Sequence, residues 1–344
     1  MGIRICFIED SVGFDGYSPT ARPLDGPQKA LAYLSGSLAQ RGHTVTVLNR
    51  STLSLVCDGV AWPGPAGEKP TACDLLVAVD DAALFDRVPE AGRRLLWVSG
   101  SPDRISATPA RKAAIDRLRP EIVFHSFAQR DRWMNPEGLT AHVIAPAIGH
   151  AYLEDISLVP SIPPRAIAVC HPLHGLERIV RLWADHVQPA VPDAELHVYS
   201  ARLDRAILSG EVPGDLVAIH DRVRTTMGVV VARPLADPQL ADAYRAARVF
   251  LHPSRADEAL ALNLMEAQAT GLPAVAFGEA PLARERVADG ETGAIRYGEE
   301  AYAAAVVEFL KDDAKWRAAS DRARETRRGR SWAIAASEWE EKFA

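Results

Sequence analysis

The chain has 344 residues, of which 24% are charged and 48% hydrophobic, and its formal net charge is −6 at pH 7. A chain of this length usually folds around more than one hydrophobic core, so we expect two domains. The negative charge argues against general nucleic-acid binding, and no apolar run approaches the roughly 20 residues that a membrane span needs. The N-terminal segment reads as a strand rather than as a signal peptide. Four scattered cysteines without metal-like spacing indicate a reduced, cytoplasmic protein: Cys6, Cys57, Cys73 and Cys170.

The first half of the chain alternates short apolar segments with helical patterns. Residues 3–8 and 45–48 are predicted strands, and residues 28–41 between them form a predicted helix with its leucines on one face. This order predicts parallel strands with a right-handed crossover. Residues 10–27 and 57–72 are rich in glycine, proline and polar residues and are predicted loops. Further strands are expected at residues 75–79, 95–98, 122–124 and 143–144, and a helix at residues 111–118.

Prolines accumulate at residues 158–165, where periodicity disappears, and this segment is the expected domain boundary. After it the alternation of strands and helices begins again. Strands are expected at residues 166–169, 195–199, 229–231, 249–251 and 274–277, and helices at residues 176–186, 239–246, 258–270, 301–310 and 314–327. The predicted fold is α/β, with two Rossmann-like, doubly wound domains, residues 1–160 and 161–328, facing across a cleft. Residues 329–344 are an amphipathic segment expected to pack back on the first domain.

The stretch from Arg255 to Thr270 carries two acids, Glu258 and Glu266, close to the expected start of a helix. A strand before it ends in His-Pro-Ser, and Gly271 with Pro273 ends the helix after it. Two carboxylates in this position can hold the hydroxyls of a ligand whose phosphates meet the free N–H groups of the helix. Acidic residues are also common at ordinary helix starts, so the pattern alone leaves both interpretations open.

Several segments together resemble the GT-B glycosyltransferases, specifically the large retaining group called family 4. Residues 237–254 are similar to that family's segment before its two glutamates, and Glu258 and Glu266 fit its pair eight residues apart. Residues 266–273 and 285–293 fit the continuation, and residues 25–27 with 41–45 fit the family's first-domain pattern. The resemblance covers most of the chain and is strongest from about Ala166 onward. Its specificity comes from the ordered set of motifs.

The resemblance implies a role for each matching residue. Glu266 would accept hydrogen bonds from the ribose of a sugar nucleotide, and Glu258 would hold hydroxyls of the donor sugar. Gly26, which has no Cβ, would let a first-domain loop approach the diphosphate. The backbone N–H groups expected to face the diphosphate are those of Leu260, Ala261, Leu262 and Asn263, and the nucleobase would lie at Arg233 to Leu235. No cofactor and no metal site are implied; a nucleoside-diphosphate sugar is the donor substrate.

The sequence departs from its family where positive charge is expected. Members usually carry an Arg and a Lys after the first strand of the second domain, whereas His171 and His174 stand there in this chain. Imidazole titrates near pH 6.5, so it is cationic only under some conditions. The alternatives are that these histidines, or Arg255, Arg233 or Arg284, replace the usual pair, or that the grip on the diphosphate is lost.

Two smaller departures concern the donor sugar. Ala259 and Ala261 stand where the family has glycines between its glutamates, which narrows the loop. Ser99 or Ser101 occupies the place of a family histidine near the sugar, although a Ser-Gly-Ser-Pro sequence is equally an ordinary turn.

We therefore expect a retaining, metal-independent glycosyltransferase that moves a sugar to a hydroxyl of a glycan, lipid-linked or small-molecule acceptor. The alternative is a catalytically impaired GT-B protein that binds nucleotide or partner proteins. A nicotinamide oxidoreductase is disfavoured, because no G-x-G-x-x-G opens the first helix. No nucleic-acid partner is expected, and the sequence leaves the oligomeric state open. A basic face at Arg111, Lys112, Arg117 and Arg119 is compatible with weak contact to anionic lipid, but a solvated helix face is the favoured explanation.

Overall fold

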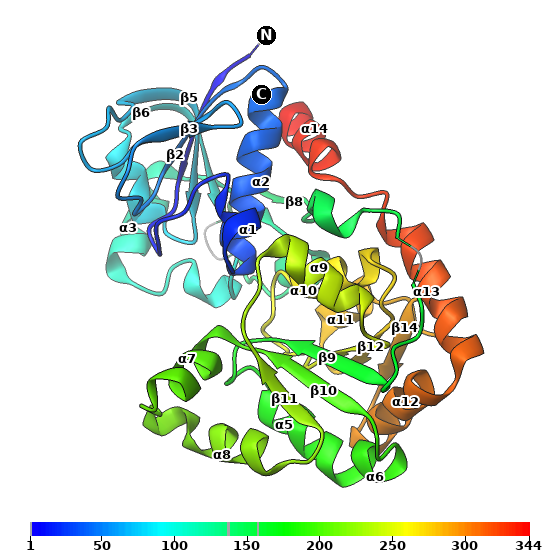
Figure 1. Ribbon diagram of the computed structural model, residues 1–344. Helices are drawn as coiled ribbons and strands as arrows, with labels where there is room; N and C mark the ends of the chain where they lie inside the picture. The colour runs from blue at the N-terminus through cyan, green and yellow to red at the C-terminus, as the bar shows by residue number, and fades with distance from the viewer. Residues whose placement is uncertain (1, 136–137, 157) are drawn as a thin grey trace. The chain divides into compact units, whose positions relative to one another are not determined.

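The computed structural model describes residues 2–135, 138–156 and 158–344. The chain forms two compact units (Figure 1). The first comprises Met1–Ala147, Asp257–Leu260 and Arg330–Ala344, and the second comprises Ile148–Ala256 and Ala261–Gly329. Each unit is built on its own sheet, so each is described separately.

The first unit contains an eight-stranded sheet in the order β3-β4-β2-β1-β5-β6-β7-β8. All neighbouring strands are parallel except β3 and β4, which form an antiparallel edge. The strands are β1 Arg4–Ile8, β2 Thr44–Leu48, β3 Leu55–Cys57, β4 Val60–Trp62, β5 Ala72–Val79, β6 Glu90–Trp97, β7 Glu121–Phe124 and β8 Ala141–Val143. The helices are α1 Ser18–Ala21, α2 Gly26–Gln40, α3 Pro109–Leu118, α4 Phe127–Asp131 and α14 Trp332–Phe343, with 3₁₀ turns at Ala82–Arg87 and Pro102–Arg104.

Alternate residues of the first sheet enter two different cores, as the two-residue period of a strand requires. Ile5 and Phe7 belong to the core that includes α2 and α14, whereas Cys6 and Ile8 belong to the core on the opposite face. The C-terminal α14 packs on α2, where the rings of Tyr33 and Trp332 stack with 6.2 Å between centroids. The last residues of the chain therefore complete the first unit.

The second unit contains a six-stranded, wholly parallel sheet in the order β11-β10-β9-β12-β13-β14. Its strands are β9 Arg165–Val169, β10 Glu195–Tyr199, β11 Val229–Ala232, β12 Val249–His252, β13 Ala274–Phe277 and β14 Gly293–Arg296. Its α-helices are α5 Leu176–Leu182, α6 Gln188–Ala190, α7 Ala201–Ser209, α8 Val217–Thr225, α9 Asp237–Arg245, α10 Leu262–Ala269, α11 Pro281–Arg286, α12 Glu299–Lys311 and α13 Asp313–Arg327. A π-helical turn, Trp183–Val187, joins α5 to α6, and 3₁₀ turns lie at His150–Tyr152 and Gly214–Leu216.

In each sheet, the chain adds strands first on one side of a central strand and then on the other. In the first unit β1 lies between β2 and β5, and in the second β9 lies between β10 and β12. Loops diverge from the carboxyl ends of the strands at such a switch point, and ligands of doubly wound proteins bind there. The fold thus identifies one candidate ligand-binding edge in each unit, at the carboxyl end of β1 in the first and of β9 in the second.

The division between the units falls after Ala147 rather than at the predicted position, residue 160. The segment that follows is anchored to the second unit by polar contacts. The Tyr152 hydroxyl donates to Asp237 Oδ1 at 2.9 Å, and Arg245 Nη2 donates to the Ala151 carbonyl at 2.6 Å. Asp155 pairs with Arg324 and Arg328 of the same unit.

Three predicted boundaries require correction. The predicted loop at residues 57–72 contains β4, because Val60 and Trp62 alternate into the core. The predicted loop at residues 10–27 contains α1 and the first two residues of α2. The helix predicted from residue 258 begins only at Leu262, because Ala261 adopts a left-handed conformation (φ 47°) that interrupts any helix through it.

Candidate functional site

The candidate site of the second unit is built on β12 and the turn that follows it. All four residues of β12 are buried. Ser254 has a positive φ of 54°, and its hydroxyl lies 2.9 Å from His252 Nδ1 and accepts from the Phe277 N–H at 3.0 Å. These contacts lock the His-Pro-Ser turn against the end of β13. The chain beyond the turn therefore starts from a fixed position at the carboxyl edge of the sheet.

Helix α10 begins at this edge without a side-chain cap. Its N-cap is Ala261, which has no polar side chain, and no acidic residue lies in its first turn. Such a helix start presents N–H groups and the positive end of the helix dipole, which together favour an anion. The side chains of Leu260, Ala261 and Leu262 are buried, so the backbone is the polar part of this segment.

Asn263 connects the start of α10 to the switch-point strand. Its Nδ2 donates to the Val169 carbonyl at 2.5 Å, and its Oδ1 accepts from the Leu264 N–H at 2.9 Å. Val169 is the last residue of β9, so the bond joins the first turn of α10 to the carboxyl end of that strand. We predicted a backbone role for Asn263, and the side-chain role came only from the structure.

The loop after β9 carries His171 and His174 on the same part of the second unit. Both side chains are exposed, their ring centroids are 4.5 Å apart, and the His174 N–H donates to the His171 carbonyl at 2.9 Å. Gly175 ends this loop with φ 87°, and a Cβ there would lie 2.8 Å from the Pro253 Cβ. Glycine is required for both reasons, because it alone tolerates this φ and this close approach. The histidine loop consequently lies against the turn that precedes α10.

Glu266 lies on the second turn of α10 and is 1% exposed. Asp237, Tyr152 and Tyr244 are buried in the same unit, and the two tyrosine rings are 6.0 Å apart. Burial raises the pKa of both tyrosines well above its usual range, and the negative charge of Glu266 raises it further. Glu266 is thus part of a buried polar group. The family-like segment 237–254 includes Asp237 and Tyr244, but the sequence did not predict that they lie close to Glu266. Tyr152, whose hydroxyl donates to Asp237, comes from a distant part of the chain, and no local pattern relates the two.

The structure does not bring all predicted residues into one unit. Glu258 belongs to the segment Asp257–Leu260, which is grouped with the first unit, whereas Glu266 belongs to the second. Arg233 is exposed and Leu235 half-buried after β11, two strands from β9, and Arg255 is half-buried after the β12 turn.

Two further predicted residues, Gly26 and Ser99, lie in the first unit. Gly26 is the first residue of α2. Ser99 donates its hydroxyl to Asp80 Oδ2, and its N–H donates to Asp80 Oδ1 at 2.6 Å. The Ser99 hydroxyl is therefore engaged within its own unit, and its oxygen can still accept a hydrogen bond.

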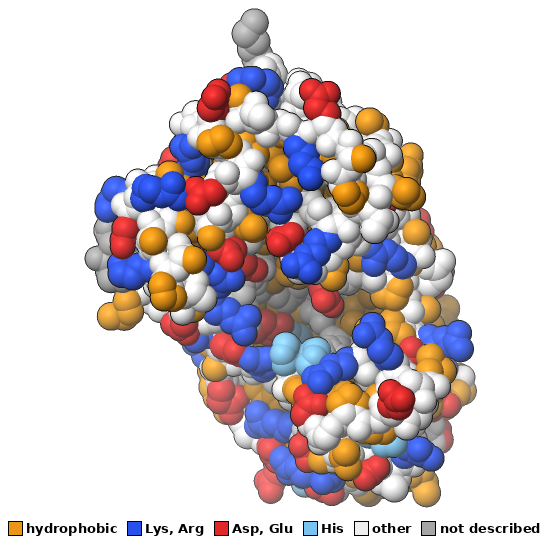
Figure 2. All heavy atoms as spheres, turned by 90° about the vertical axis from the view of Figure 1, so that its left-hand side faces the viewer, with side chains coloured by type: hydrophobic (Ala, Val, Ile, Leu, Met, Phe, Trp, Pro, Cys, Tyr) orange, Lys and Arg blue, Asp and Glu red, His pale blue; other side chains and the backbone are white. Residues whose placement is uncertain are grey.

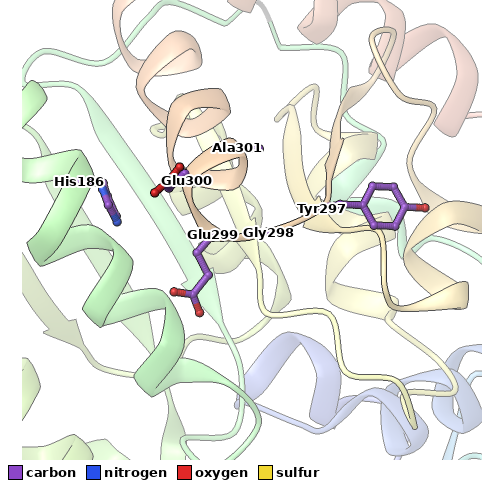
Figure 3. Close-up of a pocket in the computed structure, with 6 residues that line it drawn as sticks. All are labelled: His186, Tyr297, Gly298, Glu299, Glu300 and Ala301. Atoms are coloured by element: carbon purple, nitrogen blue, oxygen red, sulfur yellow. The ribbon is translucent and has the colours of Figure 1, made fainter.

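A separate hollow of about 450 Å³ lies at the start of α12 (Figure 3). Its lining consists of His186, Tyr297, Gly298, Glu299, Glu300 and Ala301. Glu299 pairs with Arg178 and Arg181 at 3.0 and 2.6 Å, and the Tyr297 ring points away from the two glutamates. Acidic residues at a helix start with arginine partners have a sufficient structural explanation. This hollow is distinct from the α10 edge.

Figure 2 shows basic and acidic side chains interspersed over the visible face. Within residues 2–135, 138–156 and 158–344, no group of three metal-binding side chains is close enough to hold a metal ion. In the same described part of the chain, no helix combines the length and the apolar character needed to cross a membrane.

Comparison with known proteins gives a consistent result. Residues 226–326 match the sequence model of the family described as Glycosyl transferases group 1. The comparison with curated proteins found no match. Sucrose-phosphate synthase from Thermosynechococcus elongatus is similar in structure, with TM-score 0.72 and 17% identity over 99% of this chain and 98% of that one.

Two other solved structures are similar over 99% of both chains, each with TM-score 0.72. One is WaaG, a glycosyltransferase involved in lipopolysaccharide biosynthesis, at 13% identity. The other is Anabaena Alr3699/HepE in complex with UDP-glucose, at 15% identity. At these identities the likeness establishes the fold, and the matched segment 226–326 contains β12, α10 and Glu266.

Proposed function

We propose that this chain, which has the GT-B fold and matches the glycosyl transferases group 1 over residues 226–326, transfers a sugar from a nucleoside-diphosphate sugar to a hydroxyl acceptor, with retention and without a metal ion. The observation that carries the proposal is the uncapped start of α10 at the β9–β12 switch point, beside the loop of His171 and His174. Such an edge suits a diphosphate.

Each residue of this edge has a role in the proposal. The diphosphate receives hydrogen bonds from the N–H groups at the start of α10. In the second unit, the ribose hydroxyls donate to Glu266 and the nucleobase lies beside Arg233 and Leu235. The resemblance to the family assigns the hydroxyls of the donor sugar to Glu258. The HepE structures with UDP and with UDP-glucose support a nucleotide sugar as the donor class.

The chemical step requires groups that stabilise the negative charge of the departing diphosphate. The bond between the anomeric carbon and the phosphate oxygen breaks, and the acceptor oxygen attacks the face from which the diphosphate leaves. The acceptor proton passes to the departing phosphate. Because charge develops on that phosphate, preorganised N–H groups and imidazolium groups at His171 and His174 lower the barrier, and losing one such stabiliser typically costs about 3–4 kcal/mol.

The experiment measures both binding and turnover. Thermal shift with UDP, GDP and ADP, in the presence of EDTA, tests nucleotide binding without metal, and release of free nucleotide from UDP-sugars tests bond cleavage. We expect one nucleotide to stabilise the chain and its sugar derivatives to be cleaved. If no nucleoside diphosphate stabilises the chain, the proposal is wrong.

A second function is favoured by the two histidines. Since they replace residues that are always cationic, the chain can be a GT-B protein that binds nucleotide without transferring sugar. This alternative predicts stabilisation by a nucleotide together with no cleavage of any tested nucleotide sugar at any pH. Cleavage of one such donor removes it.

A further inference from the structure

The segment with which the second unit begins carries a tyrosine into the buried part of that unit. The 3₁₀ turn His150–Tyr152 packs against both α9 and α10, which also contact each other (Figure 1). Arg245 holds the turn on α9, because its Nη2 donates to the Ala151 carbonyl at 2.6 Å. Tyr152 itself is fully buried. The turn thus brings one aromatic side chain to the place where α9 meets α10.

Each of these two helices contributes one buried acidic side chain to the same region. Asp237 is the first residue of α9, and Glu266 lies on the second turn of α10. The Tyr152 hydroxyl donates to Asp237 Oδ1 at 2.9 Å. A buried carboxylate close to a second one stays ionised only where hydrogen-bond donors stabilise its charge. The Tyr152 hydroxyl is such a donor for Asp237.

The charges of both carboxylates act on Tyr152. Burial raises the pKa of Tyr152 well above its usual range, and the charge of Glu266 adds more to this rise than the charge of Asp237 does. Because Asp237 accepts the hydrogen bond of the hydroxyl and Glu266 still acts more strongly, the Glu266 carboxylate also lies near this side chain. With its pKa raised, the Tyr152 hydroxyl keeps its proton and remains a hydrogen-bond donor.

Tyr244 provides a comparison within the same buried group. Its ring centroid lies 6.0 Å from that of Tyr152, it is fully buried, and burial together with Glu266 and Asp237 raises its pKa as well. Its hydroxyl, however, has no hydrogen-bond partner within the part of the chain that the structure describes. Removing that hydroxyl costs no hydrogen bond, whereas removing the Tyr152 hydroxyl takes a donor away from a buried carboxylate. The two hydroxyls therefore differ in effect although their surroundings are alike.

We propose that Tyr152 is a positioning residue for nucleotide binding: by donating to Asp237, its hydroxyl keeps the Glu266 carboxylate available to the ribose hydroxyls. The inference rests on the proposed function, in which Glu266 binds ribose. When Asp237 loses the Tyr152 donor, this buried carboxylate takes up a proton more readily. A protonated Asp237 becomes a hydrogen-bond donor, and the nearby Glu266 carboxylate accepts from it. Glu266 then has one lone pair fewer for the nucleotide.

The test compares Tyr152→Phe with Tyr244→Phe, since each removes one buried hydroxyl and leaves the ring. Calorimetric titrations with UDP and 2′-deoxy-UDP should show that Tyr152→Phe binds UDP about 10-fold more weakly and loses most of its preference for UDP, whereas Tyr244→Phe behaves like the wild type. In donor cleavage, Tyr152→Phe should raise KM about 10-fold with kcat nearly unchanged, because ribose is held equally in the ground and transition states. A merely structural role would lower stability without changing the preference for UDP, and that result overturns the inference.

Asp237→Asn tests whether Tyr152 acts through Asp237, and it decides the question even where Tyr152→Phe does not fold. The asparagine amide carries permanent N–H donors, so this variant should lose the preference for UDP as Tyr152→Phe does. Adding Tyr152→Phe to it should then change UDP binding less than about 2-fold. An unchanged preference in Asp237→Asn, or a further loss of about 10-fold in the double variant, overturns the inference. If the wild type binds UDP and the variants behave like it, only the inference fails; if the wild type binds no nucleoside diphosphate, the proposed function itself fails.

Discussion

Asn263 Nδ2 donates to the carbonyl of Val169, and this bond ties the first turn of α10 to the end of β9. We predict that Asn263→Ala lowers the free energy of unfolding by about 1–2 kcal/mol, because it leaves that carbonyl without its donor. It should also weaken UDP binding about 10-fold, since the N–H groups of α10 lose their fixed position. Urea unfolding and calorimetric titration of UDP measure the two effects.

Thr226→Ala is the matched control for Asn263→Ala. Thr226 Oγ1 donates to the Arg222 carbonyl at 2.8 Å in the same unit, but at the end of α8. Its loss should reduce stability without changing the affinity for UDP. If both variants bind UDP like the wild type, the bond at Asn263 has only a structural role.

Ala261→Gly should stabilise the chain. Ala261 has φ 47°, a left-handed conformation that costs a residue with a Cβ about 1–2 kcal/mol. Glycine removes this cost but increases the entropy of the unfolded chain, so we expect a net gain of about 1 kcal/mol in urea unfolding. Ala261→Val should have the opposite sign, because a β-branched residue tolerates this conformation least. A stabilising Ala261→Val would contradict the explanation.

The sequence predicted the parts of the fold that depend on local pattern. Apolar runs placed most strands, and β13 has the same bounds as predicted, because buried parallel strands are almost wholly apolar. The predicted start of α10 was wrong, because alanine favours a helix and nothing in the local sequence shows that Ala261 adopts a left-handed conformation. Helices α7 and α8, of nine residues each, were missed, although Leu203 with Ala206 and Ile219 with Val223 give each helix a buried apolar face. The contacts of Asn263 and Tyr152 join distant segments, which no local pattern reveals.

The histidine loop predicts a pH dependence that ordinary family members with Arg and Lys would not have. If His171 and His174 stabilise the departing diphosphate as cations, their contribution is present at low pH and is lost as pH rises through about 6.5. We therefore expect kcat/KM for donor cleavage to fall between about pH 6 and pH 8.5.

His174→Lys provides the test of this dependence. A lysine remains protonated to about pH 10, so the variant should retain more of its activity at pH 8.5 than the wild type and show a shallower profile, with His171 left to titrate. His174→Ala should be slow at every pH. Identical profiles of the wild type and His174→Lys would exclude a cationic role for this residue.

Glu121 predicts an acid-dependent loss of stability in the first unit. Arg93 donates to both of its oxygens, at 2.6 and 2.9 Å, and this pairing lowers the pKa of Glu121, to which His142 also contributes. A carboxyl whose pKa is lowered by folding stabilises the fold above its unfolded pKa and loses that contribution as pH falls. Glu121→Gln should cost about 1 kcal/mol at neutral pH, the pair being partly exposed. The difference from the wild type should shrink below about pH 4.3 in urea unfolding. A constant difference from neutral to acidic pH would contradict the assignment.

The proposed contact between Glu266 and ribose can be tested with a nucleotide that lacks one ribose hydroxyl. In the proposed site its carboxylate accepts hydrogen bonds from ribose, so Glu266→Gln should weaken UDP binding by about 1.5–3 kcal/mol, the range for a hydrogen bond to a charged group. The wild type should prefer UDP over 2′-deoxy-UDP, and the variant should lose most of this preference, since the missing hydroxyl no longer has its acceptor. Urea unfolding of the variant shows whether a loss of affinity comes with a loss of stability, because Glu266 is 1% exposed. Lower stability with an unchanged preference for UDP would assign Glu266 to the core of the second unit instead.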